Sequence, residues 1–330
     1  MGAKFLLRFA VVLCGICAVC PTWGIVLHPD NEPNLATWID HPPVSVVGRW
    51  DNDASCVVIA PNYIITTRHQ TNSDTSVPGV MVNIAGTDYT IDSFFTHQSA
   101  DLRLVKLNNA NLTEYVSINF DPNEVNQVAV LGGYGVSRGA ELEVHYMGQD
   151  YTYGYEWLYP SLPTPANGIG GWGTNKVTGT SSTTAGYTSE LIVSQFDEPL
   201  TTEYECAIGE HDSGGGWFRQ TANGWEVIGL NRGVAYSGES WFLDNGNPPA
   251  PLPEYPNGPL DNYMDAVRIS PYADWIIDTI YANELQNLAV QWLRDDCGAG
   301  NNYCNGADVV DIGAVNMSDF AVLSSMWLEP

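Results

Sequence analysis

Three residues of this 330-residue chain are of types that together can carry out nucleophilic chemistry. Ser213 lies in the stretch EHDSGGGWF, His69 lies near the end of IAPNYIITTRHQ, and Asp101 begins DLRLVKL. A serine hydroxyl attacks well once a base takes its proton, and a carboxylate can orient an imidazole for that task. Each residue alone has a simpler interpretation, as a strand-end histidine, a turn aspartate or the serine of a glycine loop. Acyl transfer is therefore a hypothesis that needs a fold to bring the three together.

Short β-strands are the elements predicted to position these residues. Through residues 44–236, apolar runs and turn residues recur roughly every ten positions. CVVIAPNYIITT holds two β-branched runs separated by Pro61-Asn62, and DLRLVKL alternates apolar with polar residues. GWFRQTANGWEVIGL is a predicted hairpin with its turn at Asn223-Gly224. The pattern predicts an all-β sandwich or barrel.

A strand and a helix are predicted to follow. MDAVRI is typical of a strand, and SPYADWIIDTI of a short helix with Ser270 as its N-cap. One face of that helix carries Tyr272, Trp275, Ile276 and Ile280. The segment 246–259 contains six prolines and is interpreted as a surface loop rather than a linker. The predicted domain boundary lies at 283–286.

The charge balance excludes some classes of partner. The chain has 38 acidic and 12 basic side chains, for a net charge of −26. Nucleic acids and anionic membranes favour basic surfaces, so neither is an expected partner. The hydrophobic content of 44% is enough for a sizeable core.

The N-terminus is typical of an exported protein. Lys4 and Arg8 precede an apolar run from Phe9 to Cys20, which predicts a signal peptide at 1–24 rather than a transmembrane anchor. The preferred cleavage site is after Gly24, so the mature chain would begin at Ile25. The expected location is outside the cell, in a periplasm or at the cell surface.

Removal of that signal leaves four cysteines in an environment that permits disulfides. Cys297 and Cys304 bracket the stretch CGAGNNYC and are predicted to form a disulfide, with a zinc site as the weaker alternative. Whether Cys56 and Cys206 are paired is left open by the sequence.

The order His69, Asp101, Ser213 is that of the chymotrypsin arrangement. CVVIAP before the histidine, the hairpin after the serine, AVRISPYADWI, and an Ile-Val at the expected mature N-terminus follow in the same order. Residues 25–282 thus resemble the trypsin/chymotrypsin-like serine protease family. The resemblance implies two six-stranded antiparallel β-barrels with a C-terminal helix and a site between the barrels. It also implies a secreted serine endopeptidase that acts on protein or peptide substrates without a cofactor.

The resemblance assigns further roles. The backbone amides of His211 and Ser213 would form an oxyanion hole. The amine of Ile25, once exposed by cleavage, would form an ion pair with Asp212. No acid stands at Ala207, the position that sets basic specificity in trypsin, so a preference for Arg or Lys is not expected.

The chain also departs from the family pattern near the site. His211 replaces a usual glycine, Arg68 replaces an alanine, and Gln70 replaces a cysteine, so the usual local disulfide is missing. These departures leave a second hypothesis open, that of a catalytically impaired, protease-fold binding protein.

The C-terminal segment 285–330 has a different character. NLAVQWL and DFAVLSSMWL form a short internal repeat, and the loop between them resembles a dockerin-like, EF-hand-type module. Counting from Asp308, Asn316 and Asp319 fall at calcium-ligand positions nine and twelve, whereas Val310 and Ile312 offer no side-chain oxygen at positions three and five. The resemblance implies a cohesin-like partner and at most one weakly held Ca²⁺. A helical pair that retains only its packing and its disulfide is an equal alternative.

Overall fold

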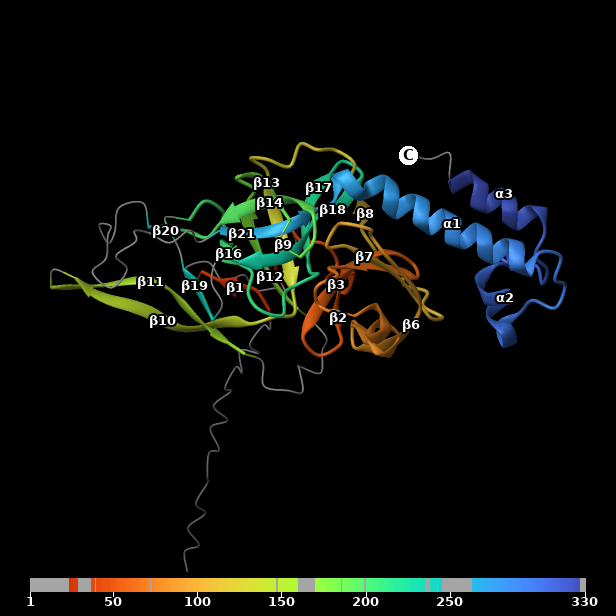
Figure 1. The fold of residues 1–330 in the computed structure, drawn as a ribbon, viewed down its shortest axis with the longest axis horizontal. Helices are drawn as coiled ribbons and strands as arrows, with labels where there is room; N and C mark the ends of the chain where they lie inside the picture. The colour runs from red at the N-terminus through yellow and green to blue at the C-terminus, as the bar shows by residue number, and fades with distance from the viewer. Residues whose placement is uncertain are drawn as a thin grey trace, which may run out of the picture.

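The computed structural model describes residues 24–28, 37–38, 40–71, 73–146, 148–159, 170–184, 186–198, 200–234, 238–241, 243–244 and 263–326. Apart from Gly24, the predicted signal at 1–24 lies outside these residues, and so does the proline-rich segment 246–259. The described chain is mostly β-structure followed by helices at its C-terminal end (Figure 1).

Six strands close into an antiparallel barrel. They are β2 (Val47–Trp50), β3 (Ala54–Ala60), β4 (Tyr63–Thr66), β5 (Met81–Ile84), β6 (Thr87–Thr96) and β7 (Arg103–Leu107). They pair in the order β2-β3-β4-β7-β6-β5, and β5 closes back onto β2. Trp50, Val58, Ile64, Val82 and Val105 are among the buried side chains of its core. The prediction of an antiparallel six-stranded barrel is confirmed for this part of the chain.

A second sheet lies beside the barrel. Its strands are β8 (Ser117–Ile118), β9 (Val128–Gly133), β12 (Gly171–Lys176), β13 (Gly179–Thr183), β14 (Ser189–Gln195), β17 (Gly216–Thr221), β18 (Gly224–Val234) and β21 (Tyr263–Arg268). The order is β12-β9-β17-β18-β21-β14-β13, and β8 joins β18 in parallel. Within the described part of the chain, no pairing joins β12 to β13. The sheet is therefore an open ladder there, and only one closed barrel is shown.

The smaller strands complete the β-structure. β10 (Ser137–Tyr146), β11 (Gln149–Leu158) and β19 (Glu239–Trp241) form a three-stranded sheet whose long hairpin projects from the body (Figure 1). β1 (Val26–Leu27) pairs with β16 (Cys206–Ala207), and β15 (Asp197–Glu198) pairs with β20 (Leu243–Asp244).

The β17–β18 hairpin is present, but its turn lies one residue earlier than the sequence predicts. Thr221 pairs with Gly224, so Ala222 and Asn223 form the turn. Gly224 has a φ of 117°, which a residue with a side chain rarely adopts, and it begins β18 rather than ending the turn.

Apolar packing holds the barrel against the second sheet. One buried cluster combines Val57 and Leu104 of the barrel with Phe218 and Leu230 of the sheet. Ile276, from the first turns of the long helix, is buried in the same cluster. The barrel and the second sheet are therefore packed firmly against each other, and this packing holds the loops that begin at their junction in place.

The helices begin after β21. They are the 3-10 turn Ser270–Tyr272, α1 (Ala273–Gln291), the 3-10 turn Ala299–Asn301, α2 (Asn302–Gly306) and α3 (Met317–Met326). The predicted helix is confirmed, but Ser270 is not its N-cap. Ser270 Oγ donates instead to Glu124, and Tyr272 occupies the cap.

Helix α1 runs without a break through 283–286, where the sequence predicts the domain boundary. No glycine or proline interrupts residues 273–297. Glu284 also fastens this stretch to the barrel, where it accepts hydrogen bonds from Lys106 Nζ, at 2.7 Å, and from the Tyr63 hydroxyl. The tail is thus carried on a helix that starts in the β-structured part of the molecule.

Candidate active site

The three residues singled out in the sequence converge at the junction of the barrel and the second sheet. His69 Nε2 lies 2.8 Å from Ser213 Oγ, and His69 Nδ1 lies 2.6 Å from Asp101 Oδ2. The Asp101 side chain is 2% exposed, whereas that of His69 is 33% exposed. The imidazole therefore has a buried carboxylate on one side and a hydroxyl on the accessible side. This is the arrangement that general-base activation of a serine needs.

Asp101 is fixed by more than the imidazole. The backbone amides of Arg68 and His69 each donate to Asp101 Oδ1, at 2.8 Å. The amide of Asp101 donates in turn to Ser189 Oγ on β14, at 2.8 Å. One carboxylate thus holds both the imidazole and the backbone of the loop that carries it. Nothing in the sequence pattern singled out Ser189.

The turn that carries Ser213 lies between β16 and β17. The Ser213 carbonyl accepts from the backbone amide of Ser55 on the barrel, at 2.8 Å. Gly214 has a φ of 80°, and a Cβ there would lie 2.3 Å from the Ser55 carbonyl oxygen. The glycine is therefore required for the turn to approach the barrel so closely.

Two backbone donors beside Ser213 are free to bind a ligand. Among the described residues, none accepts a hydrogen bond from the amide of His211 or of Ser213. His211 has a φ of 70°, in the left-handed region that favours glycine. Its Nδ1 lies 2.7 Å from the carbonyl oxygen of Asp53, and its ring packs edge-on to Tyr159. These contacts of the His211 side chain help to hold its backbone in the left-handed conformation, which a glycine would adopt without such support.

Gln70, which stands where the resemblance to trypsin-like proteases would place a cysteine, joins the histidine loop to the serine turn. Its Nε2 donates to the Ser213 carbonyl and to Thr67 Oγ1, the latter at 2.7 Å. Its Oε1 accepts from Thr66 Oγ1 at 3.0 Å. Side-chain hydrogen bonds thus link the two loops in place of the missing local disulfide.

Asp212 is buried next to the serine and is held by backbone donors. Oδ1 accepts from the amide of Gly135 at 2.8 Å, and Oδ2 accepts from the amides of Gly209 at 2.8 Å and Ile25 at 3.4 Å. Burial raises the pKa of Asp212 to about 7, against the lowering effect of these three hydrogen bonds. The peptide nitrogen of Ile25 thus lies within hydrogen-bond reach of Asp212, the acid that the resemblance pairs with the Ile25 amine.

A cavity of about 160 Å³ opens beside Ser213. Trp157, Ile208 and Val234 provide its apolar walls, and Glu210 and Arg232 bring charge to it. Ala207, which the sequence places at the specificity position, is buried one residue before Ile208 in the chain. The described lining suits an apolar side chain better than a cationic one.

Arg232 lies against the buried acid of the triad. Its Nε is 4.0 Å from Asp101 Oδ2, and its Nη1 donates to both carboxylate oxygens of Asp265, at 3.0 and 2.9 Å. Burial raises the pKa of Asp265, whereas the charge of Arg232 lowers it. Asp265 thus anchors the guanidinium group of Arg232 next to Asp101. Neither Arg232 nor Asp265 was among the candidate residues from the sequence.

In the tail, the candidate calcium ligands are engaged by their own loop. Asp308 accepts from the amides of Ile312 at 3.1 Å and Gly313 at 2.8 Å. Asp319 accepts from the amides of Val310 at 3.1 Å and Asn316 at 2.8 Å.

The side-chain oxygen of Asn316 accepts from the amide of Ser318, at 2.8 Å. Calcium takes six to eight oxygen ligands, whereas each side-chain oxygen of the three predicted ligands already accepts a backbone hydrogen bond. Val310 and Ile312 offer no side-chain oxygen, and the exposed Asp311 is not at a ligand position. The residues present do not fit a calcium ion.

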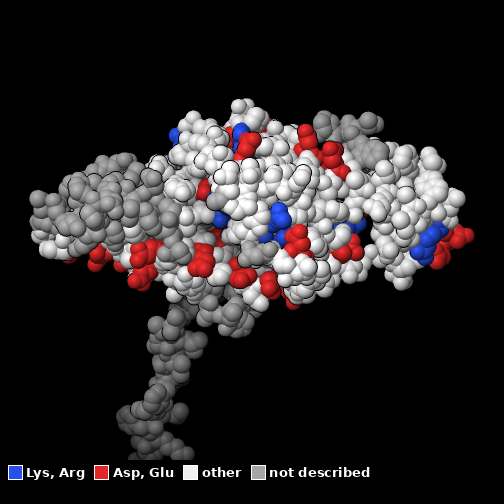
Figure 2. Space-filling view, viewed as in Figure 1, with Lys and Arg blue, Asp and Glu red and all other residues white. Residues whose placement is uncertain are grey.

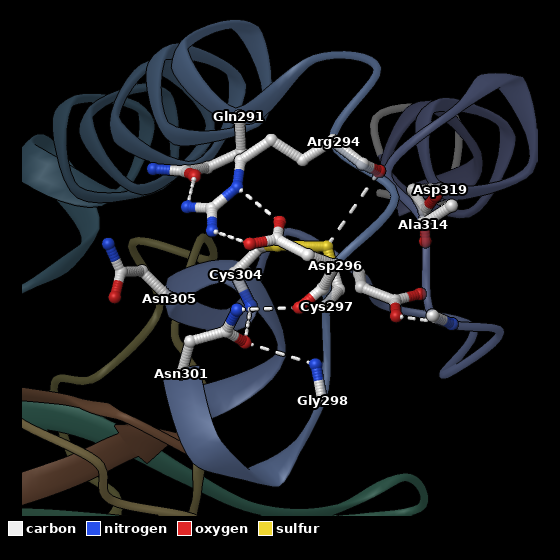
Figure 3. Close-up of a disulfide and its surroundings, with 12 residues drawn as sticks. Gln291, Arg294, Asp296, Cys297, Gly298, Asn301, Cys304, Asn305, Ala314 and Asp319 are labelled. Carbon is white, nitrogen blue, oxygen red and sulfur yellow. Dashed lines mark hydrogen bonds and ion pairs between the residues drawn. A yellow bond between two sulfur atoms is a disulfide. The ribbon is translucent and has the colours of Figure 1, made fainter.

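The predicted tail disulfide is present. Cys297 and Cys304 are joined, beside an exposed ion pair in which Arg294 contacts Asp296 (Figure 3). The one cluster of metal-binding side chains among the described residues is Asp296, Cys297 and Cys304, and its thiols are consumed by the disulfide. The tail has a small apolar core of its own, which includes Leu288, Val315 and Leu323.

Cys56 and Cys206 are both free and fully buried, in separate core clusters. Burial raises the pKa of Cys56 to about 12 and also raises that of Cys206. Neither thiol is therefore suited to act as a nucleophile.

The surface agrees with the charge balance of the chain. Acidic side chains outnumber basic ones over the face shown in Figure 2. No helix in the described part of the chain is long and apolar enough to cross a membrane.

His69 thus lies within hydrogen-bond distance of both Asp101 and Ser213, whereas the three candidate calcium ligands of the tail are bound to amides of their own loop. A scan of protein-family models gives no match, and a search of curated proteins finds no similar chain.

Proposed function

We propose that this chain is a secreted serine endopeptidase of the trypsin/chymotrypsin-like type. The observation that carries the proposal is the bridge that His69 makes between buried Asp101 and Ser213 Oγ. The free amides of His211 and Ser213 support it, because a hydrolase also needs donors for a developing oxyanion.

The proposed reaction proceeds in two halves. His69 Nε2 accepts the proton of Ser213 Oγ as this oxygen attacks the peptide carbonyl, and the negative oxygen that forms is bound by the two free amides. The protonated imidazole then gives its proton to the leaving amine, which leaves an acyl group on Ser213. Water, deprotonated by His69, attacks the acyl group and regenerates the serine. Asp101 stabilises the imidazolium and fixes its tautomer throughout.

Cleavage of the signal peptide would activate this site. We propose that removal of residues 1–24 gives Ile25 an ammonium group that forms an ion pair with Asp212. The 3.4 Å approach of the Ile25 nitrogen to Asp212 Oδ2 supports this idea. So does β1, which already pairs Val26 with Ala207 beside the serine turn. Export and activation would then be one event.

The overall architecture fits the same proposal. We propose that the open second sheet corresponds to the second barrel of the trypsin-like fold, with the serine turn between the two bodies. The tail would attach the enzyme to a cohesin-like partner. The exposed apolar side chains of Leu293, Ile312 and Met317, at 71%, 60% and 63%, support a docking role for the tail.

A second candidate function is that of a protease-fold binding protein with an impaired site. The left-handed His211 favours it, because a side chain stands where the family keeps a glycine. One experiment separates the two candidates. The mature chain should degrade an unfolded protein substrate, and Ser213→Ala should not. Binding of the substrate without cleavage by the unsubstituted chain would support the binding protein instead.

A further inference from the structure

A cavity lies away from the triad, between the barrel, helix α1 and the tail. It has a volume of about 760 Å³, which is within the range of small-molecule sites. A hollow is visible between the body and the tail in Figure 2, on the side where α2 approaches the barrel in Figure 1. We call this cavity the tail groove.

The walls of the tail groove are held in place by hydrogen bonds. Glu284 of α1 binds Lys106 and Tyr63 of the barrel, and Asn283 Nδ2 also donates to the Tyr63 hydroxyl at 2.8 Å. On the tail side, Asn287 Nδ2 donates to the carbonyl of Asn305 at 2.9 Å. The groove is therefore a built feature of the fold rather than a gap between independent parts.

Carboxamide side chains dominate its lining. The groove is lined by 21 residues, of which eight are asparagine and two are glutamine. The side-chain amides that have no hydrogen-bond partner among the described residues are Asn62, Asn109, Asn111, Gln286, Asn302 and Asn305. Figure 3 shows Asn305 pointing away from the disulfide, with no interaction drawn to it. Each amide offers two donors and one acceptor oxygen, which together match hydroxyl groups.

The charges of the tail groove disfavour anions. Its one basic residue, Lys106, is already paired with Glu284. Asp308 is occupied by its own loop, which leaves Asp92 and Asp311 as exposed carboxylates. A phosphate, sulfate or uronate ligand would therefore meet repulsion rather than attraction.

The apolar parts of the groove are small and lie at the surface. Val290 and Val309 are 71% and 48% exposed, and the half-buried Tyr303 adds an aromatic ring. Such surfaces can contact the C–H face of a ring that carries hydroxyl groups at its edge. They do not form the deep apolar pockets that peptide side chains need for recognition.

We propose that the tail groove binds a neutral oligosaccharide. Unpartnered amides supply the hydrogen bonds to its hydroxyl groups, Tyr303 and the two valines contact its ring faces, and the exposed acids repel anionic glycans. The site is separate from Ser213, so this binding does not depend on the proposed hydrolysis.

The test is a binding screen with the full mature chain carrying Ser213→Ala. The probes are immobilised neutral gluco-, manno-, xylo-, galacto- and N-acetylglucosamine oligosaccharides, with a uronate polymer and unstructured peptides in parallel. At least one neutral series should bind. Calorimetry on that ligand should then show roughly a threefold to tenfold loss of affinity for Gln286→Ala and for Asn111→Ala, since each change removes one hydrogen-bonding group.

Gln98→Ala and Gln220→Ala are matched controls, because both amides are exposed and lie outside the groove. These two variants should bind like the parent chain. The proposal is overturned if no neutral oligosaccharide binds at millimolar concentration, or if the groove and control variants behave alike. Binding of the uronate polymer or of a peptide that the groove variants weaken would also overturn it.

Discussion

The candidate active site and the tail loop each contain buried aspartates, but the carboxylates are used differently. At the candidate active site, Asp101 Oδ1 accepts hydrogen bonds from two backbone amides, and Asp101 Oδ2 binds His69 Nδ1. In the tail, both carboxylate oxygens of Asp308 and of Asp319 accept hydrogen bonds from backbone amides of their own loop. Asp101 thus keeps one oxygen for a side chain from another loop, whereas the oxygens of Asp308 and Asp319 are used within their own loop.

This difference bears on how ligand positions are interpreted. An acidic residue at the expected spacing shows that the chain has a carboxylate at a ligand position. It does not show whether backbone amides of the folded loop already bind that carboxylate. Asp212 is an intermediate case, because backbone amides surround it in the chain that still retains Gly24. Its role changes if a charged amine replaces the Ile25 peptide nitrogen.

The largest expected effect is on Asp101. Asp101→Asn should lower kcat on a peptide substrate by roughly 10⁴-fold, which is the loss that the same change causes in a Ser-His-Asp triad. The reason is that the asparagine amide stabilises the wrong tautomer of His69. The fold should persist, since Oδ1 can still accept from the amides of Arg68 and His69. Circular dichroism and steady-state kinetics measure both. A variant with nearly full kcat would show that the carboxylate is only structural.

The second prediction compares the chain that retains Gly24 with the chain that begins at Ile25. In the longer chain, the folded pKa of Asp212 is about 7, above the ordinary value of 3.8. Between these two pH values, Asp212 is protonated in the native state and ionised in the unfolded state. The free energy of unfolding therefore falls as the pH rises through this window, by on the order of 4 kcal/mol. An ammonium at Ile25 should offset this loss.

Urea unfolding of both forms from pH 4 to pH 7.5 measures the effect. Asp212→Asn is the control, because it removes the titrating carboxyl and should abolish this fall in stability in the chain that retains Gly24. Equal pH dependence of the unsubstituted forms would contradict the proposed ion pair.

The third prediction concerns the tail. Asp319→Asn places an amide NH₂ group against the amide of Val310 or of Asn316, and should destabilise the tail by about 1–3 kcal/mol. Hydrogen exchange at those two amides should accelerate, while hydrolysis at Ser213 stays unchanged. Asp311→Asn is a matched control, because Asp311 is exposed and already has a φ of 50°, which asparagine tolerates. Similar exchange rates in both variants would show that Asp319 does not close the loop.

The smallest expected effect is that of calcium. Because the oxygens of Asp308, Asn316 and Asp319 already accept backbone hydrogen bonds, neither millimolar Ca²⁺ nor a chelator should shift the Tm of the full chain. Differential scanning calorimetry measures this. A rise in Tm that saturates with Ca²⁺ would show that the loop opens to a cation.

Local patterns were sufficient to predict part of this structure. The apolar runs around Pro61-Asn62 predicted β3 and β4, and the alternation of DLRLVKL predicted β7. The meeting of His69, Asp101 and Ser213 was predicted from the resemblance to the trypsin/chymotrypsin-like family, whose chain order these residues share, and not from local pattern. The hairpin turn was misplaced by one residue, since Asn-Gly is a strong turn signal even where glycine begins the strand.

Other features depend on contacts between distant segments. Arg232 reaches Asp101 and Asp265 because the β18–β21 register shifts between Asn231 and Gly233, and no local pattern encodes that bulge. Helix α1 is fastened to the barrel by the contact of Glu284 with Lys106, 178 residues away in the chain. The tail groove arises from that same docking.

Covalent labelling of Ser213 tests the central claim most directly. A fluorophosphonate probe should form one adduct with the mature chain, and mass spectrometry of the digested protein should place it on Ser213. Labelling should be lost in Ser213→Ala and strongly slowed in Asp101→Asn, because the attack needs an oriented His69. An unlabelled mature chain, or an adduct on a different residue, would contradict the account.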